Sequence, residues 1–259
     1  MADKFIWYEL MTPDLDAALD FYRAVVGWEA ADHEGATPGG ARYVILSGGG
    51  RGMGGAMQLG EGMLAGGARP GWFGYVGVDD TDAKAREVEA AGGKVLMEPG
   101  DIPGVGRFAF VADPGGAPFY LLTPLPRQDA PPPLGRDARG AVAWHELHSA
   151  SGEAAAFAFY SRLFGWETMQ EMPMGPMGTY RIVGADGEPM GGMMDKPAES
   201  PAAMWGFYFN VEGIDAAAER VAAHGGQVLR EAHQVPDGSW VIAARDPQGA
   251  AFALNSTRR

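Results

Sequence analysis

Long internal repeats constrain the fold of this chain more than any other feature. The segment FYRAVVGWE at residues 21–29 returns as FYSRLFGWE at residues 159–167, an offset of 138. Two further motifs recur in the same order: Trp-x-Glu-Leu at residues 7–10 and 144–147, and Asp-Pro-x-Gly-Ala at residues 113–117 and 246–250. A repeat of this length predicts a duplicated domain rather than the short unit of a solenoid.

Composition excludes several classes of partner and chemistry. The length of 259 residues accommodates two domains of ordinary size, and the net charge of −13 disfavours nucleic acid and anionic membrane surfaces. Cysteine is absent, which excludes disulfides, thiolate zinc sites and cysteine nucleophiles. The chain has no signal-peptide pattern and no apolar run of about 18 residues, so we expect a cytoplasmic protein.

The domain boundaries follow from the repeat and from a segment rich in proline. Residues 1–125 are predicted to form the first domain and residues 140–259 the second, with a semi-rigid linker at residues 126–139. Fused copies can imitate a homodimer of single-domain proteins. We therefore expect a monomer (a pseudo-dimer) or a weak homodimer.

Each domain divides again into two similar units. Four alternating segments predict strands, each followed by a helical pattern and then by short strands with glycine turns; these segments are Phe5–Met11, Trp72–Val78, Val142–His148 and Trp205–Val211. Asp14 and Asp80 stand where they can cap the first two helices. The pattern predicts an α+β fold of two domains, each a pair of βαβββ units whose mixed sheet curls into a cup. The concave face of such a cup is the expected ligand site.

These motifs resemble the vicinal oxygen chelate superfamily, which includes glyoxalase I, bleomycin-resistance proteins and extradiol dioxygenases. The βαβββ units in tandem, the Phe-Tyr-x5-Gly end of the first helix and the Asp-Pro-x-Gly turn before a final strand carry the resemblance. It covers nearly the whole chain, and it looks closer to two-domain glyoxalase-like bacterial proteins. Because this fold hosts metalloenzymes and plain binding proteins alike, the resemblance implies the fold more strongly than the reaction.

The resemblance also locates the positions that hold the metal ion in metal-dependent members, at the first and last strand of each unit. In this chain those positions carry residues that are poor metal ligands, namely Trp7, Phe73, Trp144, Gly206, Tyr120 and Ala253, with the remaining two near Met57-Gln58 and Met193-Met194. Only Gln58 offers a donor, and one neutral amide does not hold a divalent ion. We therefore expect no metal ion and no other cofactor.

A carboxylate beside an indole is the best candidate for chemistry in each cup. Strand alternation places Trp7, Glu9 and Met11 on one face, and Trp144, Glu146 and His148 on the equivalent face. Glu9, Glu146 and His148 are the candidate acid–base residues. The structural alternative is a carboxylate at the centre of each sheet that accepts hydrogen bonds from the backbone or from a Tyr hydroxyl, and a histidine with a purely structural role.

The candidate ligand-binding residues are aromatic or methionine side chains: Trp7, Trp144, Tyr120, Met174 and Met193. Tyr120 can donate its hydroxyl to a ligand or to Glu9, or it can simply pack beside Phe119. Methionines crowd into residues 169–204, and the segment 171–178 has the composition of a flap over an adaptable apolar pocket. For Trp72 and Trp205 we expect core packing.

Two functions stay open at this point. The first is a metal-independent glyoxalase-like or bleomycin-resistance-like protein that binds a small apolar or aromatic molecule. The second is a lyase, isomerase or hydroxylase that acts on a small metabolite, with a Glu as the acid–base group. A third reading is a structural or interaction protein whose cups are filled by its own side chains.

Overall fold

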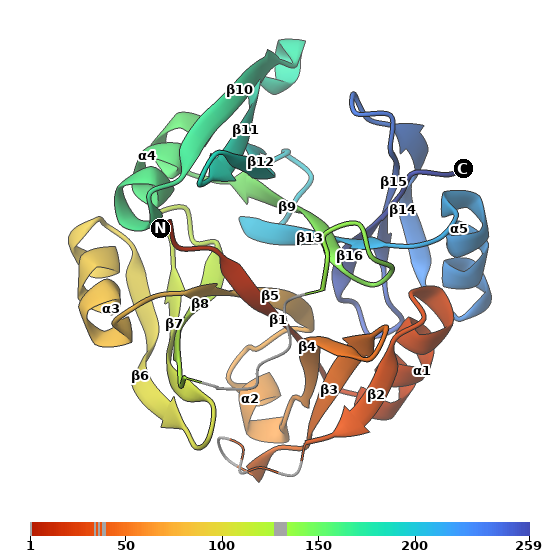
Figure 1. Cartoon of the computed structure of the whole chain (residues 1–259), viewed down its shortest axis with the longest axis horizontal. Coiled ribbons are helices and arrows are strands. Elements are labelled where there is room, and N and C mark those ends of the chain that lie inside the picture. The colour runs from red at the N-terminus through yellow and green to blue at the C-terminus, as the bar shows by residue number, and fades with distance from the viewer. Residues whose placement is uncertain (1, 34, 36, 38–39, 127–133) are drawn as a thin grey trace. The chain divides into compact units, whose positions relative to one another are not determined.

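The computed structural model of the chain describes residues 2–33, 35, 37, 40–126 and 134–259 (Figure 1). Within these residues the strands form two eight-stranded mixed sheets, each drawn from one half of the sequence. The predicted α+β class with paired units is confirmed. Of the predicted linker, residues 127–133 lie outside the described residues.

The first sheet has the strand order β2-β3-β4-β1-β5-β8-β7-β6. Its strands are β1 (Phe5–Thr12), β2 (Glu29–Asp32), β3 (Tyr43–Gly48), β4 (Arg51–Gln58), β5 (Gly71–Gly77), β6 (Lys94–Ile102), β7 (Gly106–Ala112) and β8 (Pro118–Pro124). Pairs β1–β4 and β5–β8 are parallel, whereas the hairpin neighbours within each unit are antiparallel.

The second sheet repeats that order as β10-β11-β12-β9-β13-β16-β15-β14. Its strands are β9 (Val142–Ser149), β10 (Glu167–Pro173), β11 (Thr179–Ala185), β12 (Glu188–Asp195), β13 (Met204–Asn210), β14 (Gln227–Gln234), β15 (Trp240–Arg245) and β16 (Ala251–Ser256). The parallel pairs are again the first and last strands of each unit, β9–β12 and β13–β16.

One helix follows the first strand of each βαβββ unit. These helices are α1 (Leu15–Val25), α3 (Thr81–Ala90), α4 (Glu153–Phe164) and α5 (Ile214–Ala223). The chain also forms the short α-helix α2 (Glu61–Ala65) and the short 3-10 helix η2 (Gly175–Met177). Asp14 accepts a hydrogen bond from the Ala17 amide, and Asp80 accepts one from the Ala83 amide, so both predicted N-caps are confirmed. No described helix has the length and apolar character needed to cross a membrane.

The chain packs into two compact units, and each combines one βαβββ motif from each half. The first unit contains Met1–Ile6, Phe73–Arg127 and Trp144–Gly206. The second contains Trp7–Trp72, Gln128–Ala143 and Phe207–Arg259. The sheets thus follow the halves of the sequence, whereas the cores that cover them draw on both halves.

A buried chain of three polar side chains links the two halves within the second compact unit. The Trp72 indole donates to the Tyr22 hydroxyl at 2.8 Å, and that hydroxyl donates to Asp246 Oδ2 at 3.2 Å. The other oxygen of Asp246 accepts from the Ala250 amide and closes the Asp-Pro-x-Gly turn. Tyr22 is 1% exposed and Asp246 3%, so this Trp–Tyr–Asp bridge satisfies groups that have no access to water.

The first compact unit holds the counterpart of this bridge. Trp205 donates to the Tyr160 hydroxyl at 2.9 Å, which donates to Asp113 Oδ2 at 3.2 Å. Burial raises the pKa of Asp113 and of Asp246, against the opposing effect of these hydrogen bonds. The Phe-Tyr motif of each half therefore bonds to the Asp-Pro turn of the other half. The core positions predicted for Trp72 and Trp205 are confirmed, since they are 5% and 2% exposed.

Candidate functional site

Burial alternates along β9, the first strand of the second sheet, but not along the second half of β1. On β9, His145 and Leu147 are buried, whereas Trp144, Glu146 and His148 are partly exposed. On β1, Glu9, Leu10 and Met11 are all buried, at 5%, 1% and 7% exposed. The strands thus present Trp7, Glu9 and Met11 in the first half, and their counterparts in the second, on the face away from Leu10 and Leu147. We call this the open face of each sheet.

In the first half, a tyrosine joins the tryptophan to the carboxylate. The Trp7 indole donates to the hydroxyl of Tyr43, on β3, at 2.9 Å. Burial, the negative charge of Glu9 and a hydrogen bond to Glu9 together hold the pKa of Tyr43 well above its usual range. The hydroxyl therefore stays protonated and donates to the carboxylate. We refer to this arrangement as the Trp–Tyr–Glu relay.

The second half repeats the relay. Trp144 donates to the Tyr180 hydroxyl at 2.8 Å, and that hydroxyl donates to Glu146 Oε2 at 2.9 Å. Burial raises the pKa of Tyr180 far above its usual value, and the charge of Glu146 raises it further. Each half thus builds the same hydrogen-bonded chain from strands β1 and β3, or β9 and β11.

Glycines on the neighbouring strand make room for the tyrosine rings. Gly55 is paired with Glu9 in the parallel β1–β4 register, and Gly192 is paired with Glu146 between β9 and β12. A Cβ atom on Gly55 would overlap the Tyr43 hydroxyl, and one on Gly192 would overlap that of Tyr180. A Cβ atom on the preceding glycines, Gly54 and Gly191, would overlap backbone carbonyls of β1 and β9. The repeated Met-Gly-Gly sequence is therefore a steric requirement of the relay.

Sequence reasoning missed Tyr43 and Tyr180, although a signal was present. Both tyrosines are separated by the same 137 residues as Trp7 and Trp144, and each precedes a Met-Gly-Gly sequence. A comparison of the halves at constant offset would have selected them.

The halves differ at the residue that follows the carboxylate on the same face. In the second half, His148 Nε2 lies 3.0 Å from Glu146 Oε1, so this carboxylate is engaged on both oxygens. The corresponding residue of the first half is Met11, which is 7% exposed. The sequence predicted that Glu146 and His148 lie together, and the two side chains are in contact.

Two of the methionines assigned to ligand binding lie in different environments. Met193 is completely buried and is paired in register with Leu147, so it lies on the core side of β12. Its neighbour Met194 is paired with His148 and is partly exposed. Met174 is 38% exposed and precedes the η2 turn. A ligand on the open face would therefore meet Met194 rather than Met193.

Tyr120 lies in an aromatic stack of the first compact unit. Its ring is 4.3 Å from that of Tyr75 and 4.4 Å from that of Phe110, and it is 3% exposed. Packing thus accounts for the whole ring, as the alternative interpretation of this residue held.

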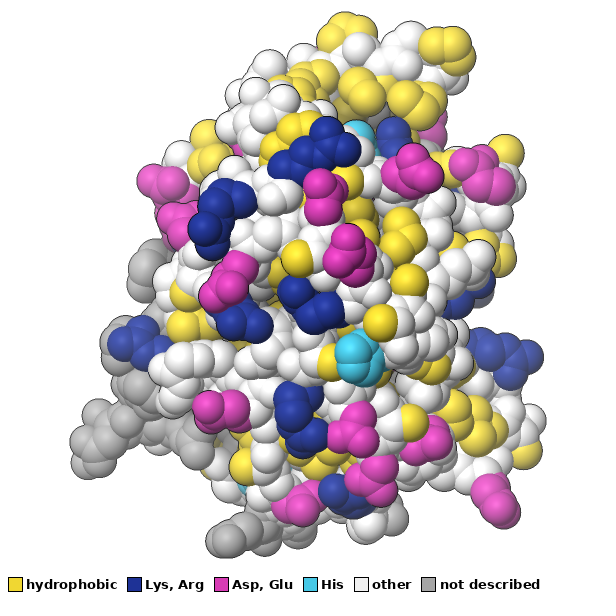
Figure 2. Space-filling view, turned by 90° about the vertical axis from the view of Figure 1, so that its right-hand side faces the viewer, with side chains coloured by type: hydrophobic (Ala, Val, Ile, Leu, Met, Phe, Trp, Pro, Cys, Tyr) yellow, Lys and Arg dark blue, Asp and Glu magenta, His cyan; other side chains and the backbone are white. Residues whose placement is uncertain are grey.

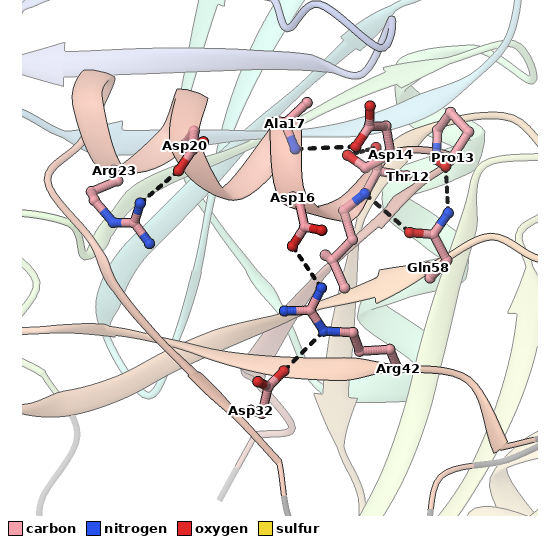
Figure 3. Close-up of polar contacts among 11 residues, drawn as sticks. Thr12, Pro13, Asp14, Asp16, Ala17, Asp20, Arg23, Asp32, Arg42 and Gln58 are labelled. Carbon is pink, nitrogen blue, oxygen red and sulfur yellow. Dashed lines mark hydrogen bonds and ion pairs between the residues drawn. The ribbon is translucent and has the colours of Figure 1, made fainter.

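The residues at the metal positions implied by the family resemblance do not fit a metal ion. Trp7 and Trp144 offer only indole N–H donors, and both donate to tyrosine. The amide of Gln58, the one donor left, accepts from the Leu15 amide at 3.0 Å and donates to the Pro13 carbonyl, so it caps α1 (Figure 3). Among the described residues, no group of three or more His, Cys, Asp or Glu side chains is placed to hold a metal ion.

Two surface hollows lie away from the relays and are lined in part by charged side chains. One of about 310 Å³ lies beside α1, where Arg42 bridges Asp16 at 2.6 Å and Asp32 at 3.0 Å (Figure 3). Another of about 470 Å³ includes Asp3 and Asp186. On the face that Figure 2 shows, Lys and Arg side chains are interspersed with Asp and Glu, so the net negative charge forms no single patch there.

Comparisons with known proteins agree with this architecture. A family model described as the Glyoxalase/Bleomycin resistance protein/Dioxygenase superfamily matches residues 4–121 and 152–254. "Putative glyoxylase CFP32" of Mycobacterium tuberculosis is 32% identical over 251 residues, which cover 96% of this chain and 92% of that protein. "Anthracycline biosynthesis protein DnrV" of Streptomyces peucetius is 30% identical over 264 residues, 97% and 92% of the two chains.

Solved structures show the same fold at lower identity. The Mn(II)-bound glyoxalase from Novosphingobium aromaticivorans aligns with a TM-score of 0.65 at 16% identity, over 100% of this chain and 82% of that one. The 2,2',3-trihydroxybiphenyl 1,2-dioxygenase of Sphingomonas wittichii strain RW1 aligns with a TM-score of 0.67 at 14% identity, over 99% and 91%.

Proposed function

Because the chain belongs to the Glyoxalase/Bleomycin resistance protein/Dioxygenase superfamily, we propose that it binds a small, largely apolar or aromatic molecule on the open face of its sheets, without a metal ion at the family's ligand positions. The observation that carries the proposal is the replacement of the ligand on each first strand by Trp7 or Trp144. An indole offers a flat apolar surface to a planar ligand and no lone pair to a cation.

The relay adds one polar feature to this surface. Glu9 is 5% exposed and the Glu146 side chain 17%, so both carboxylates are largely shielded from solvent, and a tyrosine hydroxyl links each one to its indole. A bound molecule that carries a hydroxyl or amino group would find an acceptor there. Two relatives are named as anthracycline biosynthesis proteins, which supports an anthracycline as the first probe.

The test is a titration of the protein with an anthracycline in which the tryptophan fluorescence is measured at each addition. We expect saturable quenching in the wild-type protein and a Kd at least about tenfold higher in Trp144→Ala, the loss of about 1.4 kcal/mol that one aromatic contact supplies. Trp240→Ala is the matched control, because Trp240 lies on β15 with Arg259 stacked over it at 4.9 Å. Equal affinities in the wild type and Trp144→Ala would contradict binding at the open face.

The proposed absence of a metal ion is tested by measuring the metal content of the protein. The protein is incubated with Mn²⁺, Zn²⁺, Ni²⁺ or Fe²⁺, desalted, and its metal content per chain is determined by elemental mass spectrometry. We expect well below one metal per chain. A stoichiometric metal that is lost in Glu9→Gln or Glu146→Gln would contradict it.

An enzyme of the lyase, isomerase or hydroxylase type is the second candidate. The hydrogen-bonded pair of Glu146 and His148 favours it, because a carboxylate and an imidazole in contact are a common acid–base arrangement.

A further inference from the structure

We propose that the second sheet carries a proton-abstraction site in which His148 is the base and Glu146 its positioning residue, acting on a carbon acid within the apolar or aromatic class of the proposed function. The inference rests on that function for ligand binding. It adds that the two open faces are not equivalent, since the first one has Met11 at the position of His148.

The hydrogen bonds define which nitrogen of His148 takes the proton. A carboxylate only accepts hydrogen bonds, so the contact of 3.0 Å to Glu146 Oε1 places the proton of the neutral imidazole on Nε2. The lone pair is then on Nδ1, the nitrogen away from the carboxylate. As Nδ1 takes a proton from a bound molecule, the carboxylate stabilises the imidazolium that forms.

The remainder of the relay holds the carboxylate in place. Glu146 Oε2 accepts from the Tyr180 hydroxyl at 2.9 Å, and Tyr180 accepts from the Trp144 indole at 2.8 Å. The raised pKa of Tyr180 keeps its hydroxyl a donor. The carboxylate is thus held at both oxygens and presents one orientation to the imidazole.

The position of His148 suits contact with a ligand. Its side chain is 27% exposed, more than the 17% of Glu146 that orients it. Its neighbour in register across β12 is Met194, which is apolar and partly exposed. A partly exposed base beside an apolar side chain is suited to a planar carbon acid.

The first half lacks this capability for a plain chemical reason. Met11 stands where His148 stands, and a thioether does not accept a proton at neutral pH. Glu9 and Tyr43 then form a relay that ends at the carboxylate, with no imidazole beside it on β1. The duplication thus supplies an internal reference for the site in the second half.

The probe for this activity is 5-nitrobenzisoxazole, a planar aromatic carbon acid. His148 Nδ1 would take the proton from C3, the electron pair of that C–H bond would form the nitrile, and the ring N–O bond would break to leave the phenolate. The step needs no oxidant, reductant or metal, and the coloured phenolate is measured directly by absorbance.

We expect the wild-type protein to accelerate this elimination above an equal concentration of free imidazole. In His148→Met, which copies the first half, and in His148→Gln, kcat should fall by roughly 10²-fold, the usual contribution of a general base. His224→Gln is the matched control, since His224 is an exposed histidine at the end of α5, and its rate should equal that of the wild type. An unchanged rate in both His148 variants, or a wild-type rate no greater than that of imidazole, would overturn the proposal.

The role of Glu146 is tested separately, because a structural carboxylate would also be sensitive to substitution. In Glu146→Gln we expect kcat to fall with KM unchanged, and in Glu146→Asp a partial recovery of kcat at the same melting temperature as Glu146→Gln. A change in KM alone would show that Glu146 contributes to binding only and would contradict its positioning role.

The binding experiment separates the two proposals. Saturable anthracycline quenching without elimination would leave the proposed function intact and overturn the base. Absence of both quenching and elimination would overturn the proposed function together with this inference. The His148→Met variant should keep the wild-type melting temperature, which shows that it is folded.

Discussion

The βαβββ units that begin the two halves build the same relay and surround it differently. Trp7, Tyr43 and Glu9 have direct counterparts in the second half, and the glycines that make room for the tyrosines are repeated as well. The surroundings have diverged at the neighbouring strand position, where Met11 corresponds to His148. Features that sterics and buried hydrogen bonds require are common to both halves, whereas a position that borders the open face differs.

A second difference between the halves lies at the helix that follows. In the first half, Arg42 pairs with Asp16 of α1, and the side chains are 46% and 79% exposed. In the second half, Arg181 pairs with Glu153 of α4, at 14% and 8% exposed, and its guanidinium lies 4.6 Å from the Phe157 ring centroid. These ion pairs occupy different positions of the repeat, and the one in the first half is solvated whereas the one in the second half is buried.

The largest effect should come from this buried ion pair. Arg181→Ala would leave the Glu153 carboxylate buried without its partner, at a cost of about 3 kcal/mol in the free energy of unfolding. Arg42→Ala removes a solvent-exposed arginine for comparison, and it should show no measurable loss because its ion pairs are screened by solvent. Urea unfolding measures both, and equal losses would remove the distinction between the halves.

Alanine at the glycines of the relay should have the next largest effect. Gly55→Ala and Gly192→Ala place a methyl group against a tyrosine hydroxyl, and overpacking of this kind costs about 2 kcal/mol. The control is Gly62→Ala, because Gly62 lies in α2 with open space around it. Thermal unfolding should show similar losses at Gly55 and Gly192 and none at Gly62. A loss at only one of the two would show that the relays are not equivalent.

A smaller loss is expected when a Trp–Tyr–Asp bridge is broken. Tyr22→Phe leaves the Trp72 N–H and one Asp246 oxygen unsatisfied in the core, at a cost of about 1–2 kcal/mol. Tyr160→Phe should cost the same, because its bridge has the same geometry. A double-mutant cycle of Tyr22→Phe with Asp246→Asn tests the contact itself, and strictly additive losses would mean that the two side chains do not interact.

The smallest effect is a pH dependence that the two buried aspartates share. Burial raises the pKa of Asp113 and Asp246 in the folded state, so the folded state binds protons more tightly than the unfolded state. Their contribution to stability is therefore greatest at low pH and decreases as pH rises from about 4 through the folded pKa. In the Asp113→Asn/Asp246→Asn variant this decrease should be absent. Unfolding free energies between about pH 4 and pH 7 measure it, and identical pH slopes in the two proteins would contradict the assignment.

Much of the fold was predictable because it rests on local patterns. The alternating segment at Phe5–Met11 and the Asp14 cap predicted β1 and α1 within a residue or two, since pleat and capping are properties of short segments. The pairing of Tyr22 with Asp246 was not predictable, because it joins residues 224 positions apart and depends on how the halves pack.

The candidate site was predicted in part. Trp7 with Glu9, and Glu146 with His148, follow from the two-residue period of a strand. Tyr43 and Tyr180 come from another strand, so their contact depends on sheet register, which a local pattern does not determine. The same limit explains Met193 and Met194, whose faces are exchanged by a shift of one residue.

The crossed bridges between the Phe-Tyr helices and the Asp-Pro turns have an evolutionary consequence. Each half completes the buried polar contacts of the other. A substitution at one of these positions in either copy therefore destabilises the packing of both halves. Selection for a folded chain then preserves the interlocking residues in the two copies equally. On the open faces, the relay hydrogen bonds join residues of the same half. One copy can therefore acquire new chemistry at its open face while the other copy retains its original surface.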